Sequence, residues 1–547
     1  MRGSLGESRF ETQSDARWRR PAPRARAAAR ALYAWQAPGW VFPFSLAAAL
    51  PFILAAALAP ALLSLAPTAQ MIAPIADARA IAGGAAPFEA AGAPFYSLLL
   101  LAADLFADAP GRIHLAAKAI AAALIACPMA YLASARFPAL QAILLAAALA
   151  ATVTAPFSGP AEIALAIFLL IVTALICAPA DESFGRARFE SGLAGLGLMA
   201  LWLLSPAFWL ASVGAIAAAP FLTGRGGLMR SAAGLVVFMV LAGGFELAAP
   251  GVNLARAAAL PALFGAGGIF IGESAAGLGG VAASTGIVIL AAAIFGGGEH
   301  WRGWGAGAGL ALVALLAARL AGANAAPVFV FAAALACFSI ASPFYDGISR
   351  AHDRASIAVA LVAAGLTLFW TASLIVHGSG QLMLQARVAA GAPSDIRAEL
   401  GLVQPGGPTI ANWIEEGRFS TPEARELFAL APVDQSAMLL EAASRAKTFA
   451  SHGLDVAILA GSDAACVIAE KRPCRASGAE AASEANVVFA PRLDLDPATA
   501  EAKSSAEALL YTEFKLVEQT ALWDIWVRRG AILPREVASS LNVSLNQ

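Results

Sequence analysis

The feature that most constrains this fold is a long succession of apolar segments between residues 41 and 377, rich in Ala, Leu and Gly. Segments of about 20 residues are long enough to cross the ~30 Å hydrocarbon core of a bilayer. Of the 547 residues, 59% are hydrophobic and 13% are charged, whereas an average soluble domain is about a quarter charged. This composition excludes a soluble enzyme, a disordered chain and a dedicated nucleic-acid-binding protein.

We expect eleven membrane spans, with two further apolar stretches, 94–107 and 255–272, lying at the outer interface as helices. If both stretches also crossed the membrane, the count would be thirteen. The positive-inside rule favours eleven, because most arginines of the connecting loops then fall on the cytoplasmic side. Both counts place the C-terminus outside. The expected spans are 41–66, 112–134, 138–155, 160–178, 190–205, 207–222, 230–249, 277–296, 304–322, 326–344 and 355–377.

The two ends of the chain differ from the apolar region. Residues 1–40 carry eight arginines and are predicted to form a basic cytoplasmic arm. Residues 378–547 are polar and are predicted to form a periplasmic α/β domain, in which Cys466 and Cys474 are spaced so that a disulfide is permitted. Its expected helices are 434–451 and 496–510, with another beginning at Ser420, and its expected strands are 455–460, 486–490, 513–518 and 522–528.

Several charged residues are candidates for chemistry. The long first outer loop, 67–93, carries Asp77, Arg79 and Glu89. A carboxylate at the outer surface can act as a general base or bind a cation, and the alternative is a solvated Asp77 neutralised by Arg79. Lys118 lies one to two turns inside an expected span, where an ionisable residue is costly and therefore a functional candidate. The alternative for Lys118 is a side chain that extends to the interface.

A series of short motifs resembles the membrane glycosyltransferases of the GT-C class. The resemblance is strongest to the group that contains protein O-mannosyltransferases and the bacterial aminoarabinose transferases of lipid A. The resemblance lies in the order of short motifs along most of residues 41–377. The later motifs of this order are at Glu162, at Leu203-Leu-Ser-Pro206 and at Ala325-Ala-Pro327. The first features in this order are Pro94, Tyr96, Arg112, Tyr131, Leu132, Arg136 and Phe137.

The resemblance implies a sugar donor on a polyprenyl phosphate in the outer leaflet of the bacterial inner membrane. The acceptor would be an envelope lipid, glycan or protein, and transfer would invert the anomeric carbon. Asp77 would be the general base, and Glu162 would position the acceptor or join Asp77 in holding a divalent metal ion. The residues implied for the donor phosphate are Arg112, Lys118, Arg256 and Arg319, and those implied for substrate are Arg79, Glu89 and Tyr96.

Two alternatives to this function stay open. Gly92 and Ala93 stand where the family carries a basic residue or His before its proline motif, so a non-catalytic scaffold of envelope assembly is one alternative. A polysaccharide ligase or polymerase, or a transporter, is the other. Transporters are expected to show paired halves and charges near the middle of the membrane, and the apolar segments here carry few charges.

Overall fold

A computed structural model provides the structure of the chain, and every structural statement concerns the residues that it describes. These are 38–62, 74–75, 78, 81–82, 93–107, 110–137, 139–155, 158–175, 184–251, 253, 257, 283–286, 301–321, 323, 325–332, 365–376, 378, 431–460, 474–476, 478–492, 497–520, 522–534 and 537.

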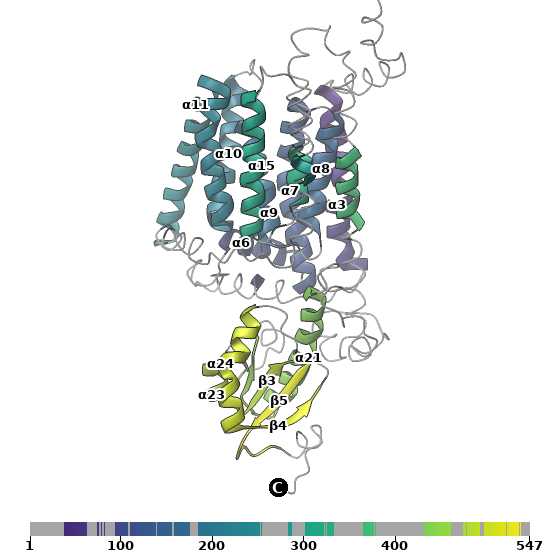
Figure 1. Cartoon of the computed structure of the whole chain (residues 1–547), viewed down its shortest axis with the longest axis vertical. Coiled ribbons are helices and arrows are strands. Elements are labelled where there is room, and N and C mark those ends of the chain that lie inside the picture. The colour runs from purple at the N-terminus through teal and green to yellow at the C-terminus, as the bar shows by residue number, and fades with distance from the viewer. Residues whose placement is uncertain are drawn as a thin grey trace, which may run out of the picture.

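The apolar part of the chain forms a helical bundle (Figure 1). Helices α10, α11 and α15 lie side by side in one part of the bundle, and α3, α7 and α8 in another. Several helices begin at a proline, whose fixed φ suits the first helical position and whose missing N–H costs nothing there. The helices are α3 (Pro38–Leu62), α6 (Pro94–Asp104), α7 (Pro110–Arg136), α8 (Ala139–Thr154), α9 (Pro160–Leu175), α10 (Phe184–Leu204), α11 (Pro206–Ala248) and α15 (Trp301–Ala321).

The number of spans is smaller than the sequence predicted. Four helical stretches of the described chain are long and apolar enough to cross a membrane, and six further apolar helices have only 10–17 residues. The expectation of eleven spans is therefore wrong for this structure, because apolar runs such as α8 and α9 form helices of only 16 residues each. The four stretches are Trp40–Leu58, Arg112–Arg136, Arg186–Leu204 and Gly227–Ala248.

Helix α6 shows why thirteen spans are not formed either. It has 11 residues, which at about 1.5 Å per residue extend roughly 16 Å. It lies at one end of the bundle (Figure 1), called here the α6 end. The stretch 255–272 and the expected span at 277–296 lie almost entirely outside the described residues. The structure thus supports a helical membrane protein with a small C-terminal sheet.

Helix α11 consists of two antiparallel arms, a first arm Pro206–Ala219 and a second arm Gly227–Ala248. The Ser231 hydroxyl donates a hydrogen bond to the Ile216 carbonyl at 3.2 Å, although residues 15 apart in a straight helix are about 22 Å apart. The rings of Trp209 and Phe238 also meet, with centroids 6.1 Å apart. The chain must therefore turn back between Ala219 and Gly227, which agrees with the two antiparallel segments expected at 207–222 and 230–249.

A glycine allows α10 to approach the second arm of α11 closely. A Cβ placed on Gly195 would lie 2.5 Å from the Val237 Cβ and 2.7 Å from the Gly234 carbonyl oxygen. Because Gly195 and Gly234 both lack a side chain, the α10 and α11 backbones approach closely there, as small residues permit in membrane helices.

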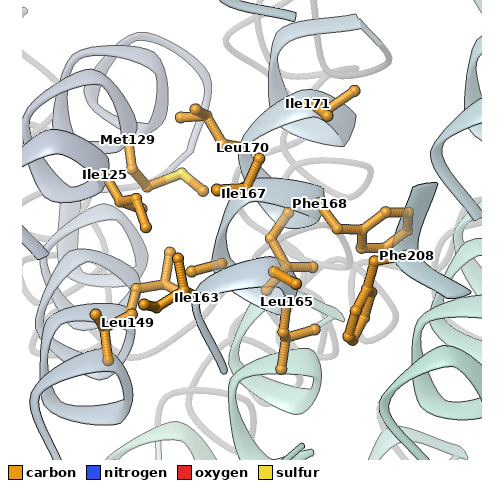
Figure 2. Close-up of a cluster of buried hydrophobic side chains, with 14 of the residues drawn as sticks. Ile125, Met129, Leu149, Ile163, Leu165, Ile167, Phe168, Leu170, Ile171 and Phe208 are labelled. Atoms are coloured by element: carbon orange, nitrogen blue, oxygen red, sulfur yellow. The ribbon is translucent and has the colours of Figure 1, made fainter. Parts of the chain in front are cut away.

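Helix α9 occupies the centre of the bundle. Every residue from Ile163 to Leu175 is buried, and a helix that is apolar on all sides requires partners on all sides. Figure 2 shows its side chains packed between Ile125 and Met129 of α7, Leu149 of α8 and Phe208 of α11. Glu162 stands in the first turn of this helix, at the edge of that core.

An ion-pair network lies at the end of the bundle opposite to α6. Arg136, the last residue of α7, pairs with Glu190 of α10, and both side chains have no exposed surface. Arg186 donates to the other Glu190 oxygen at 3.0 Å and stacks over the Tyr131 ring at 5.1 Å. Both arginines belong to helices rather than to connecting loops, and they share one carboxylate.

The C-terminal region forms a three-layer α/β domain, and the expected strands are confirmed. The sheet order is β2-β1-β3-β5-β4, with β1 parallel to β2 and β3, and β5 antiparallel to β3 and β4. The short strand β2 was not expected, and Cys466 lies outside the described residues. The elements are α21 (Ala431–Ser451), β1 (Val456–Ile458), β2 (Cys474–Ala476), α23 (Ala479–Glu484), β3 (Val487–Pro491), α24 (Pro497–Glu513), β4 (Phe514–Gln519) and β5 (Trp523–Arg528).

Alternation along the strands explains the layers of this domain, because successive side chains point to opposite faces of a sheet. Ala457 and Leu459 pack into the core formed with α23 and α24. On the other face, Phe489 meets Phe449 of α21 with ring centroids 5.7 Å apart, and the Trp523 indole N–H donates to the Met438 carbonyl at 3.1 Å.

Candidate functional site

Four polar side chains gather at the α6 end of the bundle, opposite to the ion-pair network. They are Tyr96 of α6, His114 and Lys118 of α7, and Glu162 of α9, and together they are called the polar cluster. His114 and Lys118 are four residues apart, so they share one face of α7. Ionisable groups among membrane helices are costly, which makes such a cluster a candidate for function.

Tyr96 and His114 form a buried hydrogen-bonded pair. The Tyr96 hydroxyl lies 2.7 Å from His114 Nδ1, and the two rings meet edge to face with centroids 6.0 Å apart. Both residues are at least 98% buried. Burial raises the pKa of the Tyr96 phenol and the negative charge of Glu162 raises it further, so the phenol keeps its proton at neutral pH.

Lys118 joins α7 to the end of α8. Its ammonium donates a 2.6 Å hydrogen bond to the Ala155 carbonyl, and the residue has no exposed surface. A cation at a helix C-terminus interacts favourably with the helix dipole. The Ser158 hydroxyl bonds to the Val153 and Ala155 carbonyls at 2.8 and 2.7 Å, which completes this helix end. The Lys118 side chain therefore ends against the Ala155 carbonyl inside the protein, and its extension to the membrane interface stays a prediction.

Glu162 has both a structural bond and an electrostatic role. Its Oε2 accepts a 2.6 Å hydrogen bond from the Gly159 N–H, the backward reach that a first-turn glutamate makes in a capping box. The side chain is half-buried, and its negative charge acts on both Tyr96 and Lys118. Glu162 is therefore the carboxylate that connects the start of α9 to the rest of the polar cluster.

The structure places only some of the residues that the sequence indicated. It brings Tyr96, Lys118 and Glu162 together. Arg112 is half-buried at the start of α7, two residues before His114, and Arg319 is half-buried in the last turn of α15, which packs on α11 and α9. Outside the described residues lie Asp77, Arg79, Glu89 and Arg256.

The metal prediction also stays a prediction. Within the described ranges, no group of three or more His, Cys, Asp or Glu side chains could hold a metal ion. Glu162 is described but Asp77 is not, so the proposed pairing of these two carboxylates is not tested.

Sequence reasoning missed His114. The signal was present, because Arg112, His114 and Lys118 follow one another in the first turns of an apolar helix. Its hydrogen bond to Tyr96, 18 residues earlier, depends on how α6 packs against α7.

A comparison with known protein families and with curated proteins gives no match for this chain. The class that the structure defines is a helical membrane protein with a polar cluster at one end of the bundle and a C-terminal α/β domain.

Proposed function

We propose that this protein is a glycosyltransferase that moves a sugar from a polyprenyl-phosphate donor to an envelope acceptor at the outer face of the bacterial inner membrane. The observation that carries the proposal is the polar cluster, which places a carboxylate, a buried cation and a Tyr–His pair at one end of an apolar bundle. The GT-C resemblance of the motifs around Tyr96 and Glu162 supports the same function.

The proposed reaction is a single displacement. The acceptor hydroxyl attacks the anomeric carbon, the bond from that carbon to the phosphate oxygen breaks, and the polyprenyl phosphate leaves. The hydroxyl proton passes to a carboxylate, for which Asp77 is proposed, and Glu162 positions the acceptor. Charge that develops on the leaving phosphate requires a cation nearby.

Arg112 suits this phosphate-binding role better than Lys118 does. The Lys118 ammonium is fully buried, is bound to the Ala155 carbonyl and is balanced by the charge of Glu162. Arg112 is half-buried in the first turns of α7, so unlike Lys118 it keeps exposed surface. An arginine also offers a planar pair of donors that fits phosphate oxygens. Arg256 and Arg319 stay as further proposed phosphate contacts.

A non-catalytic scaffold is the second candidate function. The observation that favours it is that Glu162 and Lys118 both make bonds that stabilise the turn between α8 and α9, to the Gly159 N–H and the Ala155 carbonyl. Such bonds are useful to the fold without any substrate. In this case the C-terminal α/β domain would bind a partner of envelope assembly.

The test is a transfer assay with the full chain in membranes. Undecaprenyl-phosphate-linked sugars are supplied one at a time, and released undecaprenyl phosphate is measured. We expect release by the unaltered protein and a loss of about 10²–10⁴-fold in Asp77→Asn, the usual contribution of a general base. We expect a loss of about 10²-fold in Glu162→Gln, as misplacement of a reactant costs.

The matched control is Glu246→Gln. The Glu246 carboxylate, on α11 and not among the residues of the polar cluster, accepts hydrogen bonds from the backbone N–H groups of Gly251 and Asn253 at 2.5 and 2.9 Å. The Glu246→Gln variant should retain the transfer activity of the unaltered protein. Equal activity of Glu162→Gln and the unaltered protein would contradict the proposed role of Glu162, and absence of release with every donor would favour the scaffold.

A further inference from the structure

The charges of the chain divide unevenly between the two ends of the bundle. The end opposite to α6, called here the network end, carries the ion pairs of Glu190. The second arm of α11 also begins there, because its Gly234 packs against Ser191, next to Glu190. The segments that belong to the network end contain thirteen arginines and six acids, in residues 1–37, 136–139, 176–190 and 220–230. Those of the α6 end contain three basic residues and six acids, in residues 63–118, 155–162 and 246–253.

The basic N-terminal residues join the bundle at the network end. The Phe42 ring, one turn into α3, meets the Tyr131 ring with centroids 6.4 Å apart, and Arg186 of the ion-pair network stacks over the same Tyr131 ring. Helix α3 therefore begins beside the network. Residues 16–37, which lead directly into α3, contain no acid and six arginines, namely Arg17, Arg19, Arg20, Arg24, Arg26 and Arg30.

Helix α10 brings further positive charge to this end. Arg136 and Arg186 share the single carboxylate of Glu190, so these three side chains together keep one positive charge. The Arg186 side chain is 26% exposed, so this charge reaches the surface. Arg188 is exposed on the same turn of α10. The network end thus presents arginines from its helices as well as from the residues that precede α3.

Aromatic side chains border these arginines. Phe189 is 53% exposed, and its ring meets the Tyr131 ring with centroids 5.8 Å apart. Phe44 of α3 is 51% exposed and packs edge to face on Trp40, with centroids 5.3 Å apart. Aromatic rings of membrane proteins gather at the level of the lipid headgroups. The headgroups of the surrounding leaflet are therefore expected level with the network end.

We infer that the network end, together with the six arginines of residues 16–37, is a surface that binds the headgroups of anionic phospholipids. Clusters of four to eight Lys and Arg beside a membrane helix recognise anionic headgroups, and the planar guanidinium fits phosphate oxygens with two bonds. RNA also attracts arginines, but the aromatic border and the direct junction with α3 favour the membrane. This surface lies opposite to the polar cluster and does not depend on the proposed transfer reaction.

The test uses native mass spectrometry of the full chain in dodecyl maltoside micelles, which counts the lipid molecules that stay bound. Phosphatidylglycerol and phosphatidylcholine with identical acyl chains are titrated separately, so that only the headgroup differs. We expect the unaltered protein to bind phosphatidylglycerol at least about tenfold more tightly. Each arginine near an anionic surface contributes about fivefold, so Arg188→Gln should lower the affinity for phosphatidylglycerol by about that factor.

Replacement of all six arginines of residues 16–37 by Gln should remove most of the preference for phosphatidylglycerol. Arg188→Gln alone keeps the test decisive if this sixfold variant does not fold. Lys515→Gln is the matched control, because it removes an exposed cation of the C-terminal domain, on β4. The Lys515→Gln variant should bind phosphatidylglycerol as the unaltered protein does.

Three results would overturn the inference. One is equal binding of phosphatidylglycerol and phosphatidylcholine by the unaltered protein. Another is a loss of affinity in Lys515→Gln as large as that in Arg188→Gln. The third concerns a 20-nucleotide uridine RNA titrated in the same micelles. If the sixfold variant loses binding of this RNA but keeps the preference for phosphatidylglycerol, the arginines of residues 16–37 bind nucleic acid instead.

Discussion

Replacement of Glu190 by Gln should destabilise the bundle strongly. Glu190 pairs with Arg136, and neither side chain has any exposed surface. Removal of one partner of a buried ion pair leaves a charge without compensation, which costs about 3–5 kcal/mol. Arg186 also loses its 3.0 Å partner, but its side chain is 26% exposed, so water stabilises it and it adds little to the cost.

The double variant Arg136→Met with Glu190→Leu tests the reasoning behind this magnitude. Replacement of both charges by apolar groups of similar size is often neutral or stabilising, so most of the lost stability should return. The assay is reversible unfolding of the full chain in mixed detergent micelles, followed by tryptophan fluorescence. Arg188→Gln, at an exposed position of α10, is the control and should change stability by less than about 0.5 kcal/mol.

The coupling energy between Arg136 and Glu190 decides whether the two residues act as a pair. We expect the double variant to be more stable than either single variant, which gives a large coupling energy in the double-mutant cycle. If the double variant loses the sum of the two single losses, Arg136 and Glu190 do not act as a pair, and the reasoning is refuted.

Three further predictions concern packing and the C-terminal domain. Gly195→Val should force α10 and α11 apart, because even a Cβ would lie 2.5 Å from the Val237 Cβ, and thermal melting of the full chain would show a lower midpoint. Arg528→Ala should cost the domain about 2 kcal/mol in denaturant unfolding, because its guanidinium donates to the carbonyls that end α23, among them Ala485 at 3.0 Å; an unchanged midpoint would contradict this. Burial raises the pKa of Glu441; Glu518 adds to this shift, while Thr520 and Arg445 oppose it. The contribution of Glu441 to stability is therefore full below its unfolded pKa and is lost as the pH rises through its folded pKa. Glu441→Gln should flatten this fall in stability above pH ~4, and an unaltered pH profile would count against it.

The C-terminal domain could be predicted from sequence because its signals are local. The strands at 455–460 and 486–490 are short apolar runs bounded by polar residues, and both are buried on two faces as such runs predict. Strand β2 has three residues and joins the edge of the sheet beside β1, so its own sequence carries little periodic signal.

The membrane region was harder to predict because apolar composition does not determine helix length. The runs at 138–155 and 160–178 have the composition of spans, yet α8 ends at Thr154 and α9 begins at Pro160, on either side of a turn stabilised by Lys118, Ser158 and Glu162. The residues of the polar cluster also differ in how far the sequence predicted them. Tyr96, Lys118 and Glu162 were indicated by motif order, whereas His114 depends on the packing of α6 against α7.

The measurement that tests the central proposal most directly is photo-crosslinking of undecaprenyl phosphate to the full chain in nanodiscs. A photoreactive group placed on the isoprenoid unit next to the phosphate labels residues close to the bound headgroup, whatever sugar the donor carries. We expect labelled peptides from the segment 93–118, which contains Tyr96, Arg112 and His114, with the label displaced by unmodified undecaprenyl phosphate. Labelling that is confined to other helices, or that excess undecaprenyl phosphate does not displace, would contradict a lipid-phosphate site at the polar cluster.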